Sequence, residues 1–485
     1  MNKSAFAFFF VFSLLFTAAF AQQKPNILFL FSDDQRVDAV GAYGNPYVKT
    51  PNIDHLAHRG VRFTNNFCMG SHHGAVCAPS RAMLMSGKSL FNVYDELEGL
   101  PTLPKTLKEN GYVTFGTGKW HNERSAFQAG FMQGKNIFFG GMSDHFQVPV
   151  VDLQADGSFS EPVKKGFSTD LFADAAVDFL ENYAVSEEDQ PFFAYVSFTT
   201  PHDPRSPKAE FLNTYGPKTL PIPADYKPVH PFNLGPMTIR DEVLNTWPRT
   251  PEDIQNHLAD YYGLITHMDT QIGRIIGTLQ KNELFENTLI IFSSDHGLSI
   301  GSHGLLGKQN LYEHSLKAPL IISGPGIPEN EVNDALVYLY DLFPTLCHLL
   351  NVQAPEGVEG KSLLPVIMGE QKDVRNSLFT TYADVQRAVK DHRWKLIRYP
   401  KINYTQLFDL KNDPYELNNL AEEPGYAAKT EEMMQRLQEW QTQTGDTLAL
   451  TAENMEPMEF DPSGIERKPD QHQPPYILEK YFDQK

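Results

Sequence analysis

The sequence contains two apolar runs without polar alternation, at 26–31 and 288–292. A strand with one face in water alternates apolar and polar residues, whereas a strand covered on both faces is apolar throughout. Two further segments, at 112–115 and 191–198, have a similar apolar character. These four segments predict strands of a mostly parallel central sheet flanked by helices.

Each predicted strand runs directly into polar side chains. These residues are Asp33, Asp34, Lys119, His121, His202, Asp295 and His296. Open α/β sheets bind ligands beyond the carboxyl ends of their strands. We therefore expect residues from distant parts of the chain to meet in one composite site.

Helical patterns at 50–57 and 257–279 lie between the predicted strands. Strands that alternate with helices indicate an α/β architecture. The Pro-rich segment 216–251 lacks periodicity, which predicts a long surface loop that lines the mouth of the site. The polar tail at 456–485 is expected to wrap the surface or to be loosely held.

The pattern changes in the last quarter of the chain. Segments 387–397 and 406–409 predict short antiparallel strands, and 429–440 predicts an amphipathic helix. A chain of 485 residues exceeds one core of ordinary size. We expect a catalytic domain at 22–365 and a smaller α+β subdomain with the tail at 366–485.

The N-terminus reads as a cleaved signal peptide at 1–21. Lys3 precedes an uncharged apolar stretch at 5–20, which closes on Ala19-Phe20-Ala21. A membrane anchor is the alternative, but this run is shorter than the ~20 residues that span a bilayer. We expect a periplasmic or secreted protein without an anchor.

The net charge of −19 argues against nucleic acid or anionic membrane as a general partner, because the long-range field repels both. Only three cysteines are present, at 68, 77 and 347. Cys347 lies in an apolar run and is expected to be a buried structural thiol. A Cys68–Cys77 disulfide is the alternative to a reactive Cys77.

The most specific motif is Cys77-Ala-Pro-Ser-Arg81, which is followed by an apolar segment ending in Ser86-Gly87. It resembles the signature of the formylglycine-dependent sulfatases, in the alkaline-phosphatase-like superfamily. The resemblance extends to 413–421 and is closest to the iduronate-2-sulfatase, choline-sulfatase and polysaccharide-sulfatase branches. It implies that a maturating enzyme oxidises Cys77 to formylglycine and that Arg81 holds the hydrated aldehyde.

The resemblance also implies a metal centre. Its ligands are Asp33, Asp34, Asp295 and His296, together with the modified Cys77. Three carboxylates favour Ca²⁺, with Mg²⁺ as the alternative ion. Imidazole suits calcium less well, so a position facing the sulfate is the alternative role for His296.

Four further residues match sulfate-contacting positions of the family. Lys119 and Lys308 would bind the sulfate, His121 the formylglycine hydrate, and His202 would protonate the leaving alcohol. Polar residues that flank the motifs are expected to include sugar contacts: His72, His73, Asn122, Arg124, Asp144, His145 and His303.

The implied reaction is sulfate-ester hydrolysis, on a glycosaminoglycan or an algal polysaccharide such as ulvan or carrageenan. The hydrate displaces the alcohol, and the resulting enzyme–sulfate expels sulfate to restore the aldehyde. One alternative is a phosphoester or phosphonate-ester hydrolase of the same superfamily. Another is a non-catalytic saccharide-binding protein, if Cys77 is not matured.

Overall fold

The computed structural model describes residues 24–186 and 189–482. The predicted signal peptide at 1–21 lies outside these ranges. Among the described residues, no helix has the length and apolar character that crossing a membrane requires.

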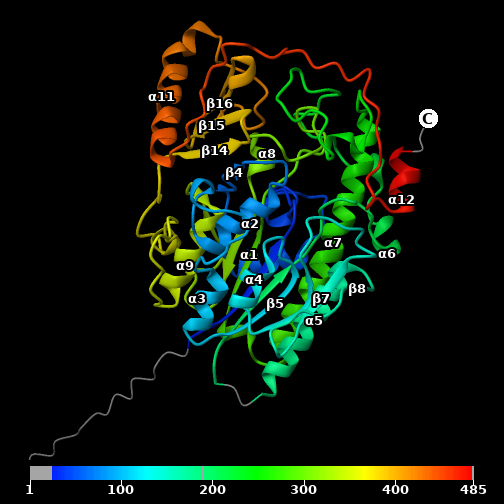
Figure 1. Ribbon diagram of the computed structural model, residues 1–485, viewed down its shortest axis with the longest axis vertical. Helices are drawn as coiled ribbons and strands as arrows, with labels where there is room; N and C mark the ends of the chain where they lie inside the picture. Colours follow the sequence, from blue (N-terminus) through cyan, green and yellow to red (C-terminus); the bar gives the residue numbers. More distant parts are fainter. Residues whose placement is uncertain (1–23, 187–188, 483–485) are drawn as a thin grey trace, which may run out of the picture.

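A mixed sheet of ten strands forms the centre of the molecule (Figure 1). Its five middle strands, β10, β1, β9, β5 and β6, are parallel, and antiparallel pairings occur toward both edges. The order across the sheet is β12 (Glu331–Asn333), β2 (Gly60–Phe63), β11 (Leu320–Ser323), β10 (Thr288–Ser294), β1 (Asn26–Ser32), β9 (Phe192–Ser197), β5 (Val113–Lys119), β6 (Gln133–Phe138), β7 (Pro149–Leu153) and β8 (Val163–Lys164). The predicted sheet and fold class are confirmed.

Helices cover both faces of this sheet, which explains the unbroken apolar run of β1. Leu28 and Leu30 pack into one buried cluster with α1, α5 and α7, whereas Phe29 and Phe31 pack into another with α2 and α3. Alternate side chains of a strand point to opposite faces, so both faces require apolar residues. The helices are α1 (Pro51–His58), α2 (Cys77–Ser86), α3 (Leu103–Glu109), α4 (Arg124–Gly130), α5 (Ser168–Ala184), α6 (Ala209–Leu212), α7 (Pro251–Lys281), α8 (Glu313–Leu316), α9 (Leu342–Leu349), α10 (Leu364–Ile367), α11 (Ala427–Thr444) and α12 (Pro475–Ile477).

A second sheet lies in the C-terminal part, with α11 against it (Figure 1). The strands β14 (Leu378–Tyr382), β15 (Gln386–Lys390), β16 (Trp394–Tyr399) and β17 (Tyr404–Asp409) are antiparallel, as expected. The sheet also includes β4 (Gly70–Ser71), which pairs in parallel with β14. A separate short pair joins β3 (Asn66–Phe67) to β13 (Val337–Tyr338). Both β3 and β4 belong to the chain leading to Cys77, and β4 joins that chain to the second sheet.

Of the two segments without periodicity, the tail runs over the surface as expected, whereas the segment 216–251 is more buried than predicted. The segment 216–251 lines the mouth of a cavity, as predicted, but it is not only a surface loop, since Phe232, Leu234 and Met237 are buried. The tail crosses the top of the molecule from α11 to α12 (Figure 1). There Lys480 Nζ lies 2.8 Å from Asp260 of α7. The tail therefore follows the surface and is fixed at its far end.

Strand β5 is longer than predicted. Its apolar part ends at Phe115, but the strand continues through two glycines to Lys119. A Cβ at Gly118 would lie 1.8 Å from the carbonyl oxygen of Ser197, so the neighbouring strand β9 requires glycine here. Lys119 is therefore the last residue of the strand instead of part of a following loop.

The junction between the two sheets gives a prediction about stability. Gly70 has φ +113°, and an added Cβ would lie 1.8 Å from Thr381 O in β14. Gly70→Ala should lower the free energy of unfolding by about 1 to 3 kcal/mol. Gly277→Ala in α7 is the control, because its Cβ meets no atom within 4 Å, and it should stabilise by up to about 1 kcal/mol. Denaturant unfolding measures both; equal stability of Gly70→Ala and wild type would contradict this account.

Candidate functional site

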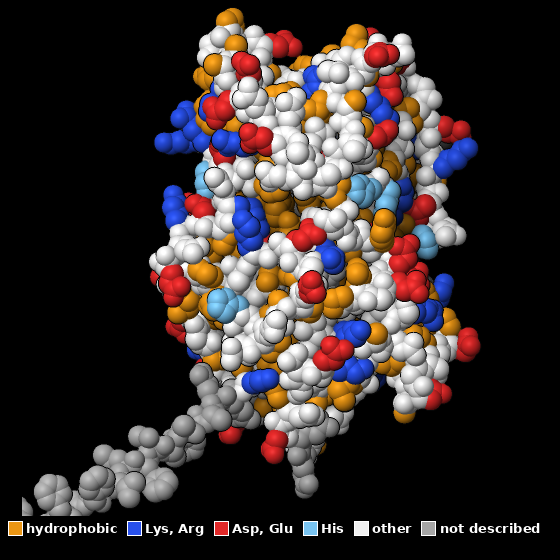
Figure 2. Space-filling view, turned by 60° about the vertical axis from the view of Figure 1, so that its left-hand side comes forward, with side chains coloured by type: hydrophobic (Ala, Val, Ile, Leu, Met, Phe, Trp, Pro, Cys, Tyr) orange, Lys and Arg blue, Asp and Glu red, His pale blue; other side chains and the backbone are white. Residues whose placement is uncertain are grey.

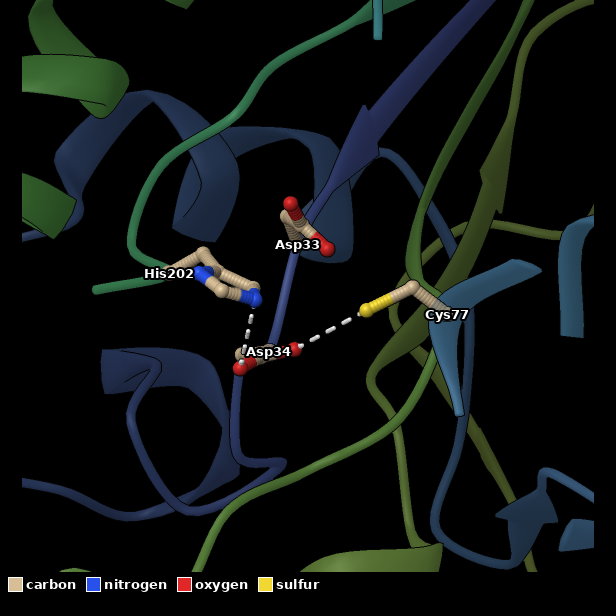
Figure 3. A group of neighbouring side chains, drawn as sticks. All are labelled: Asp33, Asp34, Cys77 and His202. Carbon is tan, nitrogen blue, oxygen red and sulfur yellow. Dashed lines mark hydrogen bonds and ion pairs between the residues drawn. The ribbon is translucent and has the colours of Figure 1, made fainter. Parts of the chain in front are cut away.

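The residues that follow the predicted strands meet at one end of the central sheet. Asp33 and Asp34 follow β1, Asp295 follows β10, and Lys119 ends β5. Cys77 is the first residue of α2, and its sulfur points toward Asp34 (Figure 3). The predicted convergence of these segments is confirmed by the distances among them.

Three carboxylates form the buried floor of the site. Asp33, Asp34 and Asp295 are each at most 1% exposed. Asp295 Oδ1 accepts hydrogen bonds from the backbone amides of Asp34 and His296, both at 3.0 Å. In contrast, Asp33 Oδ1 is buried and makes no hydrogen bond within the described part of the chain, although Arg81 Nη2 lies 3.5 Å away as an ion pair. A buried carboxylate oxygen without a donor is costly, which marks this position as suited to a cation.

Three cations pair with these carboxylates. Lys119 Nζ lies 2.6 Å from Asp33, Lys308 Nζ lies 2.8 Å from Asp34, and Arg81 Nη2 lies 3.2 Å from Asp295. The guanidinium of Arg81 is also fixed by Ser197 Oγ at 2.7 Å. Charges buried this deeply persist only when they are paired and hydrogen-bonded. The site is thus a compact array of opposite charges.

The cysteine lies inside this array. Cys77 Sγ is 3.2 Å from Lys308 Nζ, 3.3 Å from His296 Nε2 and 3.5 Å from Asp34 Oδ1. All three cysteines of the chain are free, so the alternative Cys68–Cys77 disulfide is absent. Burial raises the pKa of the Cys77 thiol well above its usual value, although Lys119 and Lys308 oppose the shift. The unmodified side chain is therefore a neutral thiol and a poor nucleophile.

His296 faces the centre of the site. Its Nδ1 lies 2.8 Å from the carbonyl oxygen of Gly297 and donates to it. Its Nε2 points toward Cys77 Sγ and Asp34 Oδ1, each 3.3 Å away. This orientation suits a metal ligand and keeps the imidazole beside the sulfur atom.

The two remaining histidines line the cavity above the cysteine. His202 Nδ1 donates to the carbonyl oxygen of Asp203 at 2.7 Å, and its Nε2 accepts from Lys308 Nζ at 2.9 Å. Burial and the charges of Lys308 and Lys119 hold the pKa of His202 well below its usual value. His121 has a buried Nδ1 without a hydrogen bond in the described chain, and burial, Lys119 and Arg81 likewise lower its pKa.

The acidic floor fits a divalent metal ion. Asp34, Cys77, Asp295 and His296 offer ligand atoms within 4.8 Å of one another, and a second set replaces Asp295 and His296 by Asp33 and His202. Burial raises the pKa of Asp33 to about 7 despite Lys119 beside it. A divalent cation would keep this carboxylate ionised, since nearby positive charge favours the charged form. Oxygen-rich sets of this kind suit hard cations.

A cavity of about 940 Å³ opens above Cys77. Its lining combines the predicted Cys77, His121, His202 and Lys308 with residues that the sequence reasoning missed. These missed residues include Met142, Ile239, Arg240, Asp241, Gln309, Asp470, Gln471 and His472. They come mainly from the segment 216–251 and from the C-terminal tail. Of the predictions made from the sequence, only the one that segment 216–251 lines the mouth of the site pointed to some of these residues.

The cavity lining does not include the predicted sugar contacts. His73 pairs with Asp95, Arg124 stacks on Phe139, and His145 holds the carbonyl oxygen of His202 at 3.0 Å. The others likewise make local contacts: His72 with Leu90, Asn122 with Ala78 and Asp95, Asp144 with Phe146, and His303 with Asp225 and Glu416. Proximity to a motif in sequence did not bring these side chains into the cavity.

Acidic and basic side chains are interspersed on the face that Figure 2 shows. Inside the cavity, the positive side chains that line the wall are Lys308 and Arg240. Lys119 and Arg81 lie behind it, paired with Asp33 and Asp295.

Comparison with known proteins agrees with this geometry. A family model described as sulfatase matches residues 25–352, and one described as N-sulphoglucosamine sulphohydrolase, C-terminal, matches residues 301–443. The chain is 28% identical to an N-acetylglucosamine-6-O-sulfatase of Bacteroides thetaiotaomicron, covering 87% of each chain. It is 30% identical to a choline-sulfatase of Rhizobium meliloti, covering 83% of each.

Solved structures share the fold. One protein, in complex with its substrate D-glucosamine-2-N,6-O-disulfate, matches with a TM-score of 0.74 and 26% identity, covering 87% of this chain and 99% of the other. A phosphonate monoester hydrolase of Agrobacterium radiobacter matches with a TM-score of 0.71 at 24% identity, covering 87% and 96%. The second similarity concerns the fold alone.

The acidic floor predicts that a divalent ion stabilises the protein. At a Ca²⁺ concentration of 100 times its Kd, the free energy of unfolding should rise by about 2.7 kcal/mol. Thermal unfolding with and without chelator measures the effect. Asp295→Asn should remove most of the shift, whereas Asp178→Asn, which alters an exposed pair with Lys135, should leave it intact. If Ca²⁺ stabilised Asp295→Asn as much as wild type, the ion would have to bind elsewhere.

Proposed function

Because this chain belongs to the sulfatase family and is a sulfuric ester hydrolase, we propose that its substrate is a sulfated saccharide and that formylglycine formed from Cys77 is the nucleophile. The observation that carries the proposal is the position of Cys77, at the floor of the cavity between Lys308 and the carboxylates. A neutral buried thiol is a poor nucleophile at this position, whereas the hydrate of an oxidised side chain supplies a nucleophilic oxygen.

The modification would be made by a formylglycine-generating enzyme acting before the chain folds, because Cys77 is buried in the folded protein. It replaces the CH₂–SH group by an aldehyde, whose hydrate supplies an oxygen nucleophile. Lys308 Nζ and His296 Nε2, both within 3.3 Å of the present sulfur atom, are suited to orient that oxygen. Arg81, one turn along α2, fixes Asp295 beside it.

The proposed metal is Ca²⁺, held by Asp33, Asp34, Asp295 and His296. When bound, it would polarise the sulfate and lower the pKa of the hydrate. The three carboxylates and the three cations of the floor cancel in charge. The ion would therefore give the centre the positive charge that an anionic ester requires, in a chain that is acidic overall.

Proton transfer to the departing sugar hydroxyl is assigned to His202. Its Nδ1 is held by the Asp203 carbonyl, so Nε2 is the nitrogen that exchanges protons. Burial and the nearby cations lower its pKa in the free site. An anionic sulfate beside Lys308 would offset that charge and raise the pKa toward the range in which a histidine acts as an acid. Lys119 and Lys308 would bind the sulfate oxygens, and His121 would hydrogen-bond the formylglycine hydrate.

Saccharide specificity is inferred from the cavity size and the relatives. A volume of about 940 Å³ accommodates more than a sulfate group, and its lining includes the polar side chains of Arg240, Asp241, Asp470 and His472. Relatives include an ulvan-active sulfatase of Formosa agariphila, 29% identical over 87% of this chain and 82% of its own. We propose residues 22–365 as the catalytic domain and the periplasm or exterior as the location.

The nucleophile gives the first functional prediction. Protein coexpressed with a maturating enzyme should release sulfate from sulfated oligosaccharides, and Cys77→Ala should be inactive. Intact-mass analysis of the peptide at position 77 should detect the aldehyde. Cys68→Ala is the matched control and should remain active. Activity of Cys77→Ala equal to wild type would overturn the assignment; an unmodified, inactive Cys77 in the native host would favour a saccharide-binding role.

The same preparation separates the ester classes. Sulfate esters should be turned over faster than phosphate or phosphonate esters of the same alcohol. The reverse order would favour the phosphoester or phosphonate-ester alternative.

The role of His202 gives a second prediction. His202→Gln should slow hydrolysis of sugar sulfates by about 10²- to 10⁴-fold, the usual contribution of a general acid. Aryl sulfates with acidic phenols need less protonation and should be affected far less. His348→Gln, an exposed histidine bonded to Ser362, is the control. An equal loss on both substrates would show that His202 binds or positions instead of donating a proton.

A further inference from the structure

A second cluster of possible metal ligands lies outside the active-site cavity. It consists of Asp225, from the segment 216–251, and of His303 and His314, from the chain on either side of Lys308. Asp225 and His303 are buried, and His314 is half-buried. Asp225 and His314 also line a separate cavity of about 420 Å³.

The ligand atoms have the spacing of a tetrahedral site. His303 Nδ1 lies 3.3 Å from Asp225 Oδ2 and 3.3 Å from His314 Nε2, and all three atoms are within 4.8 Å of one another. A tetrahedron with bonds of about 2.0 to 2.1 Å to Zn²⁺ has edges of about 3.3 Å. Two edges of the cluster therefore already have the length that such an ion requires.

The other nitrogen of each ring is anchored. His303 Nε2 lies 3.1 Å from the carbonyl oxygen of Glu416 and must donate to it, because a carbonyl only accepts. His314 Nδ1 lies 3.0 Å from Ser315 Oγ. Metal-binding histidines characteristically fix their second nitrogen in this way, which orients the ring and selects its tautomer.

The anchor of His303 decides which of its nitrogens faces the cluster as an acceptor, because the carbonyl oxygen of Glu416 requires the proton on Nε2. With its proton on Nε2, neutral His303 presents a lone pair at Nδ1 toward the carboxylate of Asp225. Burial lowers the pKa of His314. A cation would satisfy the converging lone pairs; a charged His303 is the competing explanation.

Positive residues nearby are already engaged. Arg36 forms a two-pronged pair with Asp38, at 2.7 Å for both contacts, and also binds the carbonyl oxygens of Leu298 and Ser299. Lys395 pairs with Glu313 and Glu416 at 3.0 and 2.8 Å. Their charges are offset locally, so they do not prevent a cation from binding.

We propose that Asp225, His303 and His314 form a second metal site, which binds a first-row transition ion such as Zn²⁺. Two imidazoles and a carboxylate suit this class of ion better than Ca²⁺. The fourth position faces the 420 Å³ cavity and takes water. Through Asp225, the ion joins the segment that carries Arg240 and Asp241 to the chain that presents Lys308. Lys308 lies five residues after His303 and six residues before His314.

Co²⁺ is the probe, because tetrahedral Co²⁺ absorbs strongly in the visible range. The titration uses Cys77→Ala protein from which transition metals have been removed. Ca²⁺ is present in excess so that the catalytic centre does not bind the added Co²⁺. We expect one tetrahedral Co²⁺ per chain, displaced by Zn²⁺. His314→Gln and Asp225→Asn should weaken binding by more than about 100-fold, since losing even an outer-shell partner costs about 10- to 100-fold.

His348→Gln is the matched control and should bind Co²⁺ as wild type does. Asp225→Asn preserves side-chain size, so it provides a folded variant should His314→Gln lose its structure; circular dichroism checks both. Absence of a tetrahedral spectrum in the parent protein would overturn the proposal, as would binding that persists in the folded Asp225→Asn variant. Neither readout depends on sulfatase activity.

Discussion

The pairing of three buried carboxylates with three buried cations is the interaction on which the site depends. Asp33, Asp34 and Asp295 would be prohibitively costly in this interior without Lys119, Lys308 and Arg81. The same cations would be equally costly alone. Sequence-distant segments must therefore assemble together, and the sheet provides the rigid frame that holds their ends in register.

Much of this frame could be predicted because its signals are local. The apolar run of β1 indicates coverage on both faces, and Leu28 and Phe29 indeed pack into opposite cores. The polar residues after the strands could be assigned to one site, since parallel strands place their carboxyl ends on the same edge. The end of β5 was harder to predict from the sequence, because two glycines interrupt its apolar pattern. Glycine is required at position 118, since a Cβ there would clash with the carbonyl oxygen of Ser197 in β9.

The sugar-contact predictions relied on sequence proximity, which does not determine side-chain direction. His145 follows the motif segments, yet its ring supports the backbone of His202 instead of entering the cavity. Conversely, Arg240 and His472 line the cavity but come from segments without periodicity. Their positions depend on tertiary contacts, such as that of Lys480 with Asp260, which no local pattern encodes.

The segment 216–251 is more than a wall of the cavity, because it positions a residue of the charged floor. The carboxylate of Glu242 accepts hydrogen bonds from the backbone amides of Leu306 and Gly307, at 3.0 and 2.8 Å. These are the two residues before Lys308, whose ammonium group contacts both Cys77 and Asp34. A change in this segment for a different saccharide would therefore also shift Lys308. Substrate recognition and the catalytic charge array are mechanically linked through this part of the fold.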